Sequence, residues 1–267
     1  MGDVSIEDKF LFDLQGFLVV PGVLAPAACE RLLASLRQLE ARDYEDAWQE
    51  ALGPGPAGRP TREQNRVHQV RLNGLPRLDA AFDGLIDHPR ALPYLREFVG
   101  PAQLINTWSI SKEQGAQPGG WHRGVPTSDY ACSRGCISSR MFNMVYFLTD
   151  NGPEDGCVVA LPGSHKSNFE LAWNDYPGLE MPGALPVVGR AGDLLFFSEA
   201  VIHDGLPKTT PGRRSNLYFN YAHAHYNVMA REPRNRHHFY LPPQVRRRFT
   251  ETQLELTRWM EYARWDR

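Results

Sequence analysis

Hydrophobic positions in the first hundred residues repeat mainly with the spacing of helices. Residues 8–24 predict a short helix followed by a strand, Phe17 to Val20, which a Pro–Gly pair ends. Residues 27–42 have the apolar spacing of an amphipathic helix, and a second helical region runs from Leu78 to Val99. Between these helices, residues 52–66 are rich in Gly, Pro and polar side chains, which predicts a loop that could cover a site.

The hydrophobic pattern changes after Leu104 to short apolar or alternating runs separated by Gly, Pro, Asn and Asp. Such runs are typical of antiparallel strands that form a sandwich or jelly roll. The predicted strands fall within residues 104–111, 141–148, 157–163, 193–198 and 215–224. The sequence therefore predicts a mainly β fold with flanking helices.

Neither an internal repeat nor a sharp break in composition divides the chain. We therefore predict one domain over residues 1–267. Its helical N-terminal part covers about residues 1–100, its β-rich core about residues 101–225, and a charged, helix-like tail about residues 226–267.

Composition and charge restrict the class of protein. Hydrophobic residues make up 42% of the chain and charged residues 22%, as in ordinary globular proteins. A net charge of −2 gives no bulk attraction to nucleic acid or anionic lipid, and no apolar run has the length of a membrane span. The N-terminus lacks the layout of a signal peptide, and the four cysteines show no zinc or redox spacing. We expect reduced thiols and a cytoplasmic location. We also expect a small-molecule substrate, and the basic runs in the sequence are compatible with an anionic one.

Two histidines and one arginine carry the candidate chemistry. His122 follows a Gly-rich loop, and His203 follows a strand, so the two imidazoles can meet at one metal only through tertiary structure. Imidazole nitrogen suits Fe(II), and a two-histidine site leaves positions for a bidentate oxo-acid and O₂. Arg214 follows His203 by eleven residues and, on a neighbouring strand, would meet the far carboxylate of a five-carbon dicarboxylate. Because side chains alternate along a strand, only one of Arg213 and Arg214 can face the site.

These residues stand within a longer resemblance, which covers about residues 10–222. The segments LIDHPRALPYLREFVG, YFLTDNGPEDGCVVALPGSHK, AGDLLFF and GRRS resemble the phytanoyl-CoA dioxygenase superfamily of Fe(II)/2-oxoglutarate enzymes. The resemblance implies a double-stranded β-helix, that is, a jelly roll flanked by helices. It also implies that His122 and His203 bind Fe(II), that Arg214 binds 2-oxoglutarate, and that Lys112 supports this co-substrate. His165, in LPGSHK, belongs to a structural motif of the family.

Four other residues are candidates for the wall of the pocket. Asn143 and Tyr146 fall on a strand that lines the pocket in related enzymes, and Asn143 is the candidate for a contact with the co-substrate. Trp108 and Trp121 could form apolar walls around the iron. Packing in the core is an alternative role for all four.

One position departs from the family pattern. Most members have His-x-Asp, with the aspartate as the third iron ligand, but here Gly124 stands in its place. Glycine has no side chain to bind a metal. The same replacement is the signature of the 2-oxoglutarate halogenases, in which chloride binds at the vacated position. The resemblance therefore makes chloride a candidate cofactor and includes Gly124 in the catalytic set.

Three hypotheses about the function follow from this departure. The first is a halogenase that chlorinates an unactivated carbon of a small molecule by hydrogen-atom abstraction and halide transfer. The second is a hydroxylase, in which water or a displaced carboxylate stands beside Gly124; Asp129 and Asp204 are the candidates by proximity. The third is a jelly-roll binding protein without turnover, against which the retention of His122, His203 and Arg214 argues. We expect halogenation before hydroxylation, and the sequence indicates neither the substrate nor the oligomeric state.

Overall fold

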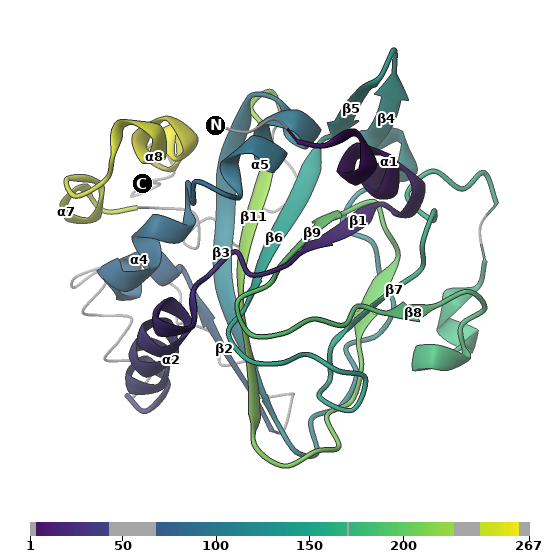
Figure 1. Ribbon diagram of the computed structural model, residues 1–267, viewed down its shortest axis with the longest axis horizontal. Coiled ribbons are helices and arrows are strands. Elements are labelled where there is room, and N and C mark those ends of the chain that lie inside the picture. Colours follow the sequence, from purple (N-terminus) through teal and green to yellow (C-terminus); the bar gives the residue numbers. More distant parts are fainter. Residues whose placement is uncertain (1–3, 43–67, 170, 227–240, 262–267) are drawn as a thin grey trace, which may run out of the picture.

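The structure is a computed structural model that describes residues 4–42, 68–169, 171–226 and 241–261 (Figure 1). The predicted loop at residues 52–66 lies outside the described residues.

A six-stranded antiparallel sheet forms the centre of the molecule (Figure 1). Its strands are, in spatial order, β1 (Phe17–Val20), β9 (Leu194–Ser198), β6 (Met141–Phe147), β11 (Arg213–His223), β3 (Ala102–Glu113) and β2 (Gln69–Asn73). Five of these strands were predicted from apolar runs. The exception is β2, whose sequence Gln-Val-Arg-Leu-Asn is half polar, because an edge strand needs to bury less of its surface.

Alternation along the strands gives this sheet one apolar face and one face with polar groups. On β6, Phe142, Met144 and Tyr146 point to the side of the helices and belong to the largest hydrophobic cluster. Asn143 and Val145 point to the opposite side, where Val145 joins a second hydrophobic cluster. Of the two roles left open for these residues, Tyr146 therefore packs in the core while Asn143 faces the pocket, because residues three apart on a strand face opposite sides.

A smaller sheet covers the polar side of the large sheet. It contains β10 (His203–Gly205), β7 (Val158–Ala160) and β8 (Leu185–Pro186), in that order. Val158 and Ala160 of β7 pack with Leu195, Phe197 and other residues of the large sheet. A separate hairpin, β4 (Tyr130–Ser133) and β5 (Cys136–Ser139), extends from one end. The site lies between the two sheets.

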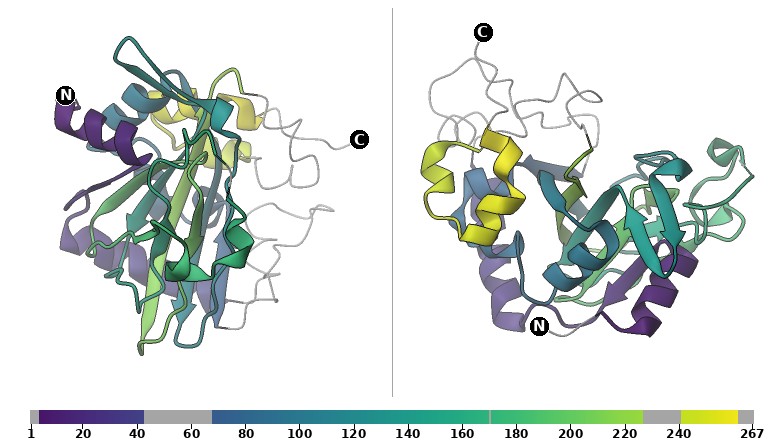
Figure 2. Two further views of the ribbon diagram at one scale, coloured as in Figure 1. Left: turned by 90° about the vertical axis from the view of Figure 1, so that its right-hand side faces the viewer. Right: turned by 90° about the horizontal axis from the view of Figure 1, so that it is seen from above.

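Helices cover the other face of the large sheet. They are α1 (Ile6–Gln15), α2 (Pro26–Glu40), α4 (Leu75–Leu78), α5 (Leu92–Val99), α7 (Pro243–Arg246) and α8 (Glu251–Leu256), with 3-10 turns at η1 (Ala80–Leu85) and η6 (Arg258–Glu261). Other 3-10 turns are η2 (Thr127–Asp129), η3 (Trp173–Asp175) and η4 (Gly178–Glu180), and Trp173 of η3 packs with Val159 of the small sheet. Figure 2 shows α2, α5 and α8 on one side of the large sheet and β7 with β8 on the other.

The second predicted helical region is divided in the structure. Residues Leu78 to Val99 form η1 and α5, with a turn at residues 86–91 between them. Pro89 has no N–H to donate, and Pro93 stands in the first turn of α5, where that missing donor costs nothing. The prediction that this region ends at Gly100 is confirmed, since Gly100 caps α5.

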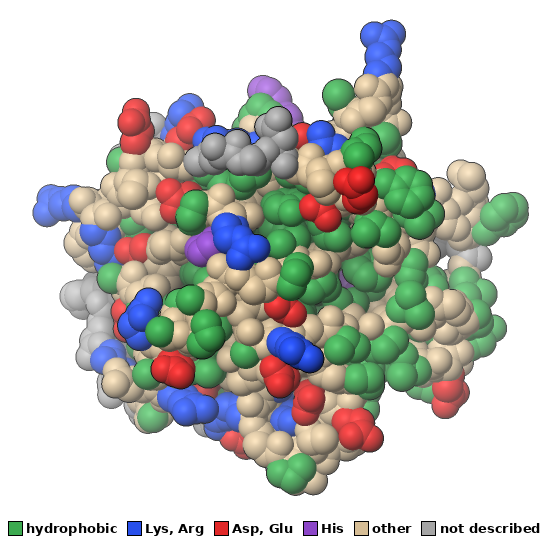
Figure 3. Space-filling view, viewed as in Figure 1, with side chains coloured by type: hydrophobic (Ala, Val, Ile, Leu, Met, Phe, Trp, Pro, Cys, Tyr) green, Lys and Arg blue, Asp and Glu red, His purple; other side chains and the backbone are tan. Residues whose placement is uncertain are grey.

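The surface carries one unusual apolar stripe. Ile6, Phe10 and Leu14 follow one another on the outer side of α1 and are all exposed. In Figure 3, hydrophobic side chains gather over the right-hand part of the visible face, and charged side chains of both signs are interspersed over the left. No helix in the described ranges is long and apolar enough to cross a membrane.

Candidate active site

A cavity of about 230 Å³ lies between the two sheets. Its walls come from β2, β3, β6, β7, β9, β10, β11 and the loop before His122. The residues that line it are Gln69, Arg71, Trp108, Ile110, Lys112, Gly119, His122, Asn143, Val158, Phe197, Glu199, His203, Asp204, Gly205, Arg214 and Tyr218. The structure thus brings together five of the six predicted site residues, and Gly124 lies against Glu199 in the same wall.

His122 and His203 face each other across an isolated antiparallel bridge. The N–H of each residue donates to the carbonyl of the other, at 3.0 Å from His122 and 2.9 Å from His203. A pair of this kind aligns the two side chains on one face, and the ring centroids are 4.3 Å apart. The bridge explains how two residues distant in sequence present their imidazoles to one point.

Backbone carbonyls orient both imidazoles. Nδ1 of His122 lies 2.8 Å from the carbonyl oxygen of Gly120, and Nδ1 of His203 lies 2.9 Å from that of Val201. Because a carbonyl only accepts, each Nδ1 carries the proton, and each Nε2 keeps a lone pair for a metal. Burial and the neighbouring His122 lower the pKa of His203 to about 3, so this imidazole is neutral. The pair fits the two-imidazole part of an iron site.

Arg214 and Lys112 form a cationic end of the cavity. They are cross-strand partners on β11 and β3, and both are buried. Arg214 donates through one terminal nitrogen to the carbonyl of Gly156, and Lys112 Nζ donates to the carbonyl of Leu206 at 2.7 Å. The buried Nε of Arg214 has no hydrogen-bond partner among the described residues, so it could receive an acceptor from a ligand. This end of the cavity therefore fits a carboxylate group.

Arg213 faces the opposite side of β11 from Arg214, which agrees with strand alternation and with the family register that favoured Arg214. Its guanidinium makes ion pairs with Glu113 and with Glu40 of α2, the latter at 2.5 Å. It fastens α2 to the sheet and is not among the residues that line the cavity.

The place beside Gly124 contains the side chain of Glu199. A Cβ atom at residue 124 would lie 2.2 Å from Oε2 of Glu199. Gly124 is not among the glycines with a positive φ, so the neighbouring side chain, and not the backbone, leaves no room for a larger residue. Glu199 is also hydrogen-bonded to Asn143, whose Nδ2 donates to Oε1.

The two carboxylates that proximity in sequence suggested have other contacts. Asp129 lies 3.5 Å from Arg140 and is not among the residues that line the cavity. Asp204 lines the cavity, but its Oδ1 accepts from the backbone N–H of Gly119 and of Gly205, at 2.9 and 2.6 Å. Asp204 thus fixes the loop before His122.

Aromatic side chains form one wall of the cavity. Trp108 stacks on Tyr218 with 5.1 Å between ring centroids, and the guanidinium of Arg71 lies 4.9 Å from the Trp108 ring. Of the two roles left open for Trp108, the structure places it in the wall of the cavity. Trp121 is buried in a separate cluster and donates from Nε1 to the carbonyl of Tyr176 at 2.8 Å.

His165 has a structural position, as the resemblance implied. Its Nε2 donates to the carbonyl of Asp13 at 3.1 Å, and its ring packs edge-on against Tyr130. Burial lowers its pKa to about 4. The LPGSHK segment thus fastens the end of α1 to the small sheet.

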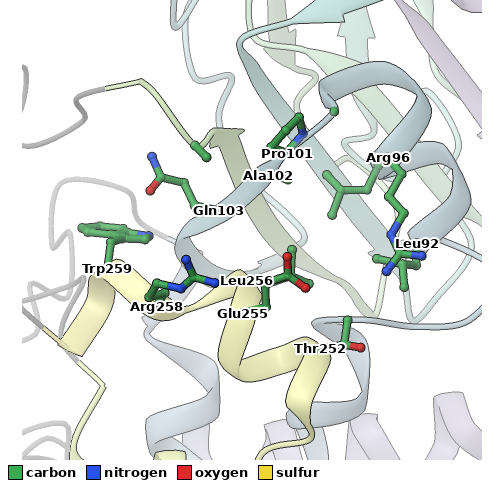
Figure 4. Close-up of a pocket in the computed structure, with 13 residues that line it drawn as sticks. Leu92, Arg96, Pro101, Ala102, Gln103, Thr252, Glu255, Leu256, Arg258 and Trp259 are labelled. Carbon is green, nitrogen blue, oxygen red and sulfur yellow. The ribbon is translucent and has the colours of Figure 1, made fainter.

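A larger cavity of about 630 Å³ lies at the other end of β3 (Figure 4). Leu92 and Arg96 of α5, Gln103 of β3, Glu255 of α8 and Trp259 face it (Figure 4). Its described lining contains no histidine and no cysteine. Size alone therefore does not locate the chemistry, and the smaller cavity with the two histidines is the candidate active site.

The sequence reasoning missed several residues of this cavity. Glu199 precedes His203 by four residues, and a search for carboxylates near either histidine could have included it. Arg71 and Gln69 were missed because β2 was not predicted, and no pattern in its sequence indicates which face meets the cavity.

Solved structures with a similar fold include a protein from Streptomyces hygroscopicus. HygX from that organism, in a crystal structure with nickel and 2-oxoglutarate bound, matches 84% of this chain and 89% of its own, with a TM-score of 0.69 and 24% identity. The 2-oxoglutarate-dependent epimerase SnoN from nogalamycin biosynthesis matches 82% of this chain and 80% of its own, with a TM-score of 0.62 and 21% identity. The expected fold, a jelly roll with flanking helices, is confirmed.

Sequence comparison identifies the family. Ectoine dioxygenase from Nocardia farcinica is 24% identical over 245 residues, which cover 81% of this chain and 77% of that protein. The model of the phytanoyl-CoA dioxygenase family matches residues 12–216, more than half of the chain. The chain therefore belongs to the phytanoyl-CoA dioxygenase (PhyH) family, within the Fe(II)/2-oxoglutarate-dependent superfamily.

Proposed function

We propose that this protein is an Fe(II)/2-oxoglutarate-dependent oxygenase that hydroxylates a small molecule. The observation that carries the proposal is the arrangement of the cavity, with two outward-presented Nε2 atoms at one end and a buried arginine at the other. Overall, substrate C–H, O₂ and 2-oxoglutarate would become substrate C–OH, succinate and CO₂. Iron, when bound, supplies the one-electron chemistry that this oxidation needs.

The protein residues have separate tasks in this reaction. His122 and His203 hold the metal through Nε2, with their rings fixed by backbone carbonyls. Arg214 binds the far carboxylate of 2-oxoglutarate, and Lys112 raises the positive potential beside it. Burial raises the pKa of nearby Cys157 to about 11, so this thiol stays neutral and leaves the cationic end positive.

The substrate enters our proposal as a small molecule with a negatively charged group. Arg71 lines the cavity from the edge strand β2 and is stacked on Trp108. Arg71 thus adds positive charge to the same cavity as Arg214, which is assigned to 2-oxoglutarate, and a negatively charged group on the substrate would be attracted to it. Thermal-shift screening of protein loaded with Zn(II) and 2-oxoglutarate should find anionic small molecules that stabilise the wild type more than Arg71→Ala. Equal stabilisation of both proteins would remove the anionic group from the proposal.

Halogenation is the second candidate, and the absence of a carboxylate side chain at Gly124 favours it. Two observations support hydroxylation instead. Glu199 Oε2 fills the space beside Gly124 that chloride would need. The Nocardia farcinica relative is an ectoine dioxygenase and not a halogenase. With a turned-over substrate in hand, mass spectrometry separates the two, since hydroxylation adds one oxygen and chlorination replaces hydrogen by chlorine.

The first experiment tests the metal and co-substrate site. Anaerobic protein titrated with Fe(II) and 2-oxoglutarate should develop a weak visible charge-transfer band. His122→Ala and His203→Ala should abolish the band, because each removes one imidazole of the pair. An unchanged band in either variant, or no band in the wild type, would contradict the proposal.

A further inference from the structure

Glu199 stands where the polypeptide before His203 approaches the segment after His122. It follows β9 directly, and its side chain lines the cavity with both histidines. Its carbonyl accepts from the N–H of Gly124 at 2.8 Å and of Val125 at 3.3 Å. The two segments are therefore fixed side by side, and Glu199 is 8% exposed.

The carboxylate of Glu199 lies against Gly124, where the side chain of an aspartate at residue 124 would begin. A Cβ atom at residue 124 would lie 2.2 Å from Oε2 and 2.9 Å from Cδ of Glu199. In an aspartate, ordinary bond lengths put each carboxylate oxygen about 2.4 Å from its own Cβ. The distance from the Cβ position of residue 124 to Oε2 of Glu199 is thus similar to the distance between Cβ and a carboxylate oxygen within an aspartate.

Two amides hold the other oxygen of this carboxylate. Oε1 of Glu199 accepts from Nδ2 of Asn143 and, at 3.2 Å, from Nδ2 of Asn220. Asn220 also donates to Oδ1 of Asn143 at 2.8 Å, so the two amides support each other. Both donors are neutral, and they orient the carboxylate so that Oε2 is the oxygen on the side of Gly124.

We propose that Glu199 is the carboxylate ligand of the metal, supplied from the strand that leads to His203 and replacing the aspartate of the His-x-Asp motif. This inference rests on the proposed function. Two imidazoles and one carboxylate with open positions are the donor set of non-haem Fe(II) oxygenases. Among the described residues, no three His, Cys, Asp or Glu side chains are already gathered as a metal site. Metal binding therefore includes a rotation of the Glu199 side chain from the two amides toward His122 and His203.

The ligand assignment has a consequence for halide. A carboxylate on the metal occupies the position that chloride would take, so the assembly of protein, Fe(II) and 2-oxoglutarate should be indifferent to chloride. Shortening residue 199 would open that position next to Gly124.

Metal affinity tests the assignment without turnover. Co(II) and anaerobic Fe(II) are titrated into the wild type, Glu199→Gln and Asp129→Asn. Glu199→Gln keeps an oxygen for Asn143 and Asn220 but loses the anionic ligand. Loss of a partner behind a metal ligand costs about 10–100-fold in affinity, so loss of the ligand should cost at least about 100-fold. Asp129→Asn makes the same chemical change outside the cavity and should bind metal as the wild type does.

Exchange of the two positions is the second arm. Glu199→Ala should weaken metal binding, and the Gly124→Asp/Glu199→Ala double variant should regain most of it, because the aspartate then enters the space that the glutamate left. Glu199→Ala alone should acquire a chloride-dependent tightening of the Fe(II)–2-oxoglutarate band. Melting temperatures of the metal-free proteins identify any variant that has not folded, and the double variant remains informative if one single variant fails.

The possible results separate this inference from the proposed function. If the wild type forms the charge-transfer band and Glu199→Gln binds metal equally well, Glu199 is not a ligand, and the proposed function stands. A wild-type band that tightens with chloride would likewise overturn the assignment. If the wild type forms no band at all, the proposed function fails first.

Discussion

Truncation of Arg213 and truncation of Arg214 should affect different properties of the protein. Arg214 meets the cavity, whereas Arg213 pairs with Glu40 and Glu113 on the helix side of the sheet. Their adjacency makes them a matched pair, with equal charge and opposite surroundings.

We expect Arg214→Ala to weaken 2-oxoglutarate binding without a comparable loss of stability. Truncation of one partner in a buried charge pair costs about 2–5 kcal/mol, which corresponds to a roughly 30-fold or greater rise in Kd. Isothermal titration with Zn(II)-loaded protein measures it.

Arg213→Ala is the control and should reverse the pattern. It leaves Glu40 buried without its ion pair, so the free energy of unfolding falls while the Kd of 2-oxoglutarate changes little. If Arg213→Ala weakened the co-substrate more than Arg214→Ala, the assignment of the two arginines would be wrong.

Residue types together with the family resemblance indicated the two histidines and the arginine, but not the residue that meets Gly124. His122, His203 and Arg214 were predictable because their chemistry is specific and their spacing matches a known motif. Glu199 was not, because its approach to Gly124 depends on the backbone hydrogen bonds between two segments distant in sequence. Asp129 follows Gly124 closely and Asp204 adjoins His203, but Asp129 pairs with Arg140, and Asp204 accepts hydrogen bonds from the loop before His122.

At the scale of elements, the junction between α1 and the small sheet depends on Gly16. This residue ends α1 with a φ of 82°, and a Cβ atom there would lie 2.4 Å from His165 Nδ1 and from Val201 Cγ2. The LPGSHK motif can therefore pack against the end of α1 only if residue 16 has no side chain.

Gly16→Ala should lower stability through both strain and overlap. Forced overpacking costs about 1–3 kcal/mol in addition to the cost of a left-handed residue with a side chain. Urea unfolding measures the loss. Gly22→Ala is the control, because Gly22 also has a positive φ but nothing within 4 Å of its Cβ position. Equal losses in the two variants would show that overlap with His165 plays no part.

The order of elements was predictable where hydrophobic periodicity was strong. The strands in residues 104–111, 141–148 and 215–224 appear within β3, β6 and β11. Short pieces such as β8 and β10 were not predicted, because strands of two or three residues carry too few side chains to establish a period. The Leu78–Val99 region is divided into η1 and α5 because of its prolines, and the apolar spacing used for the prediction took no account of them.

Across the whole molecule, the free energy of unfolding should depend on pH through a histidine that binds no metal. His165 is buried with a pKa of about 4, below its ordinary value of 6.5. Between these values the unfolded chain binds more protons than the folded one, so stability is fully present above about pH 6.5 and declines as pH falls toward 4.

For metal-free protein, we expect His165 to account for a loss of on the order of 1–2 kcal/mol between pH 7 and pH 5. Urea unfolding of the wild type and of His165→Gln at both pH values measures it. His203, whose pKa is also lowered, is present in both proteins and cancels in the difference. An equally steep loss in His165→Gln would contradict the assignment.

A metal ion bound to both His122 and His203 would hold together the two backbone segments that carry them. Two hydrogen bonds hold the loop at residues 119–125 to β10. A metal ion bound to both imidazoles would close a ring that runs from one side chain through the metal to the other and back through these hydrogen bonds. The ring must open before these two amide protons can exchange with solvent. With free metal at 100 times its Kd, exchange at His122 and His203 should slow by about 100-fold, equivalent to about 2.7 kcal/mol. Deuterium uptake at two backbone positions would then report whether both imidazoles hold a metal, without the need for a substrate.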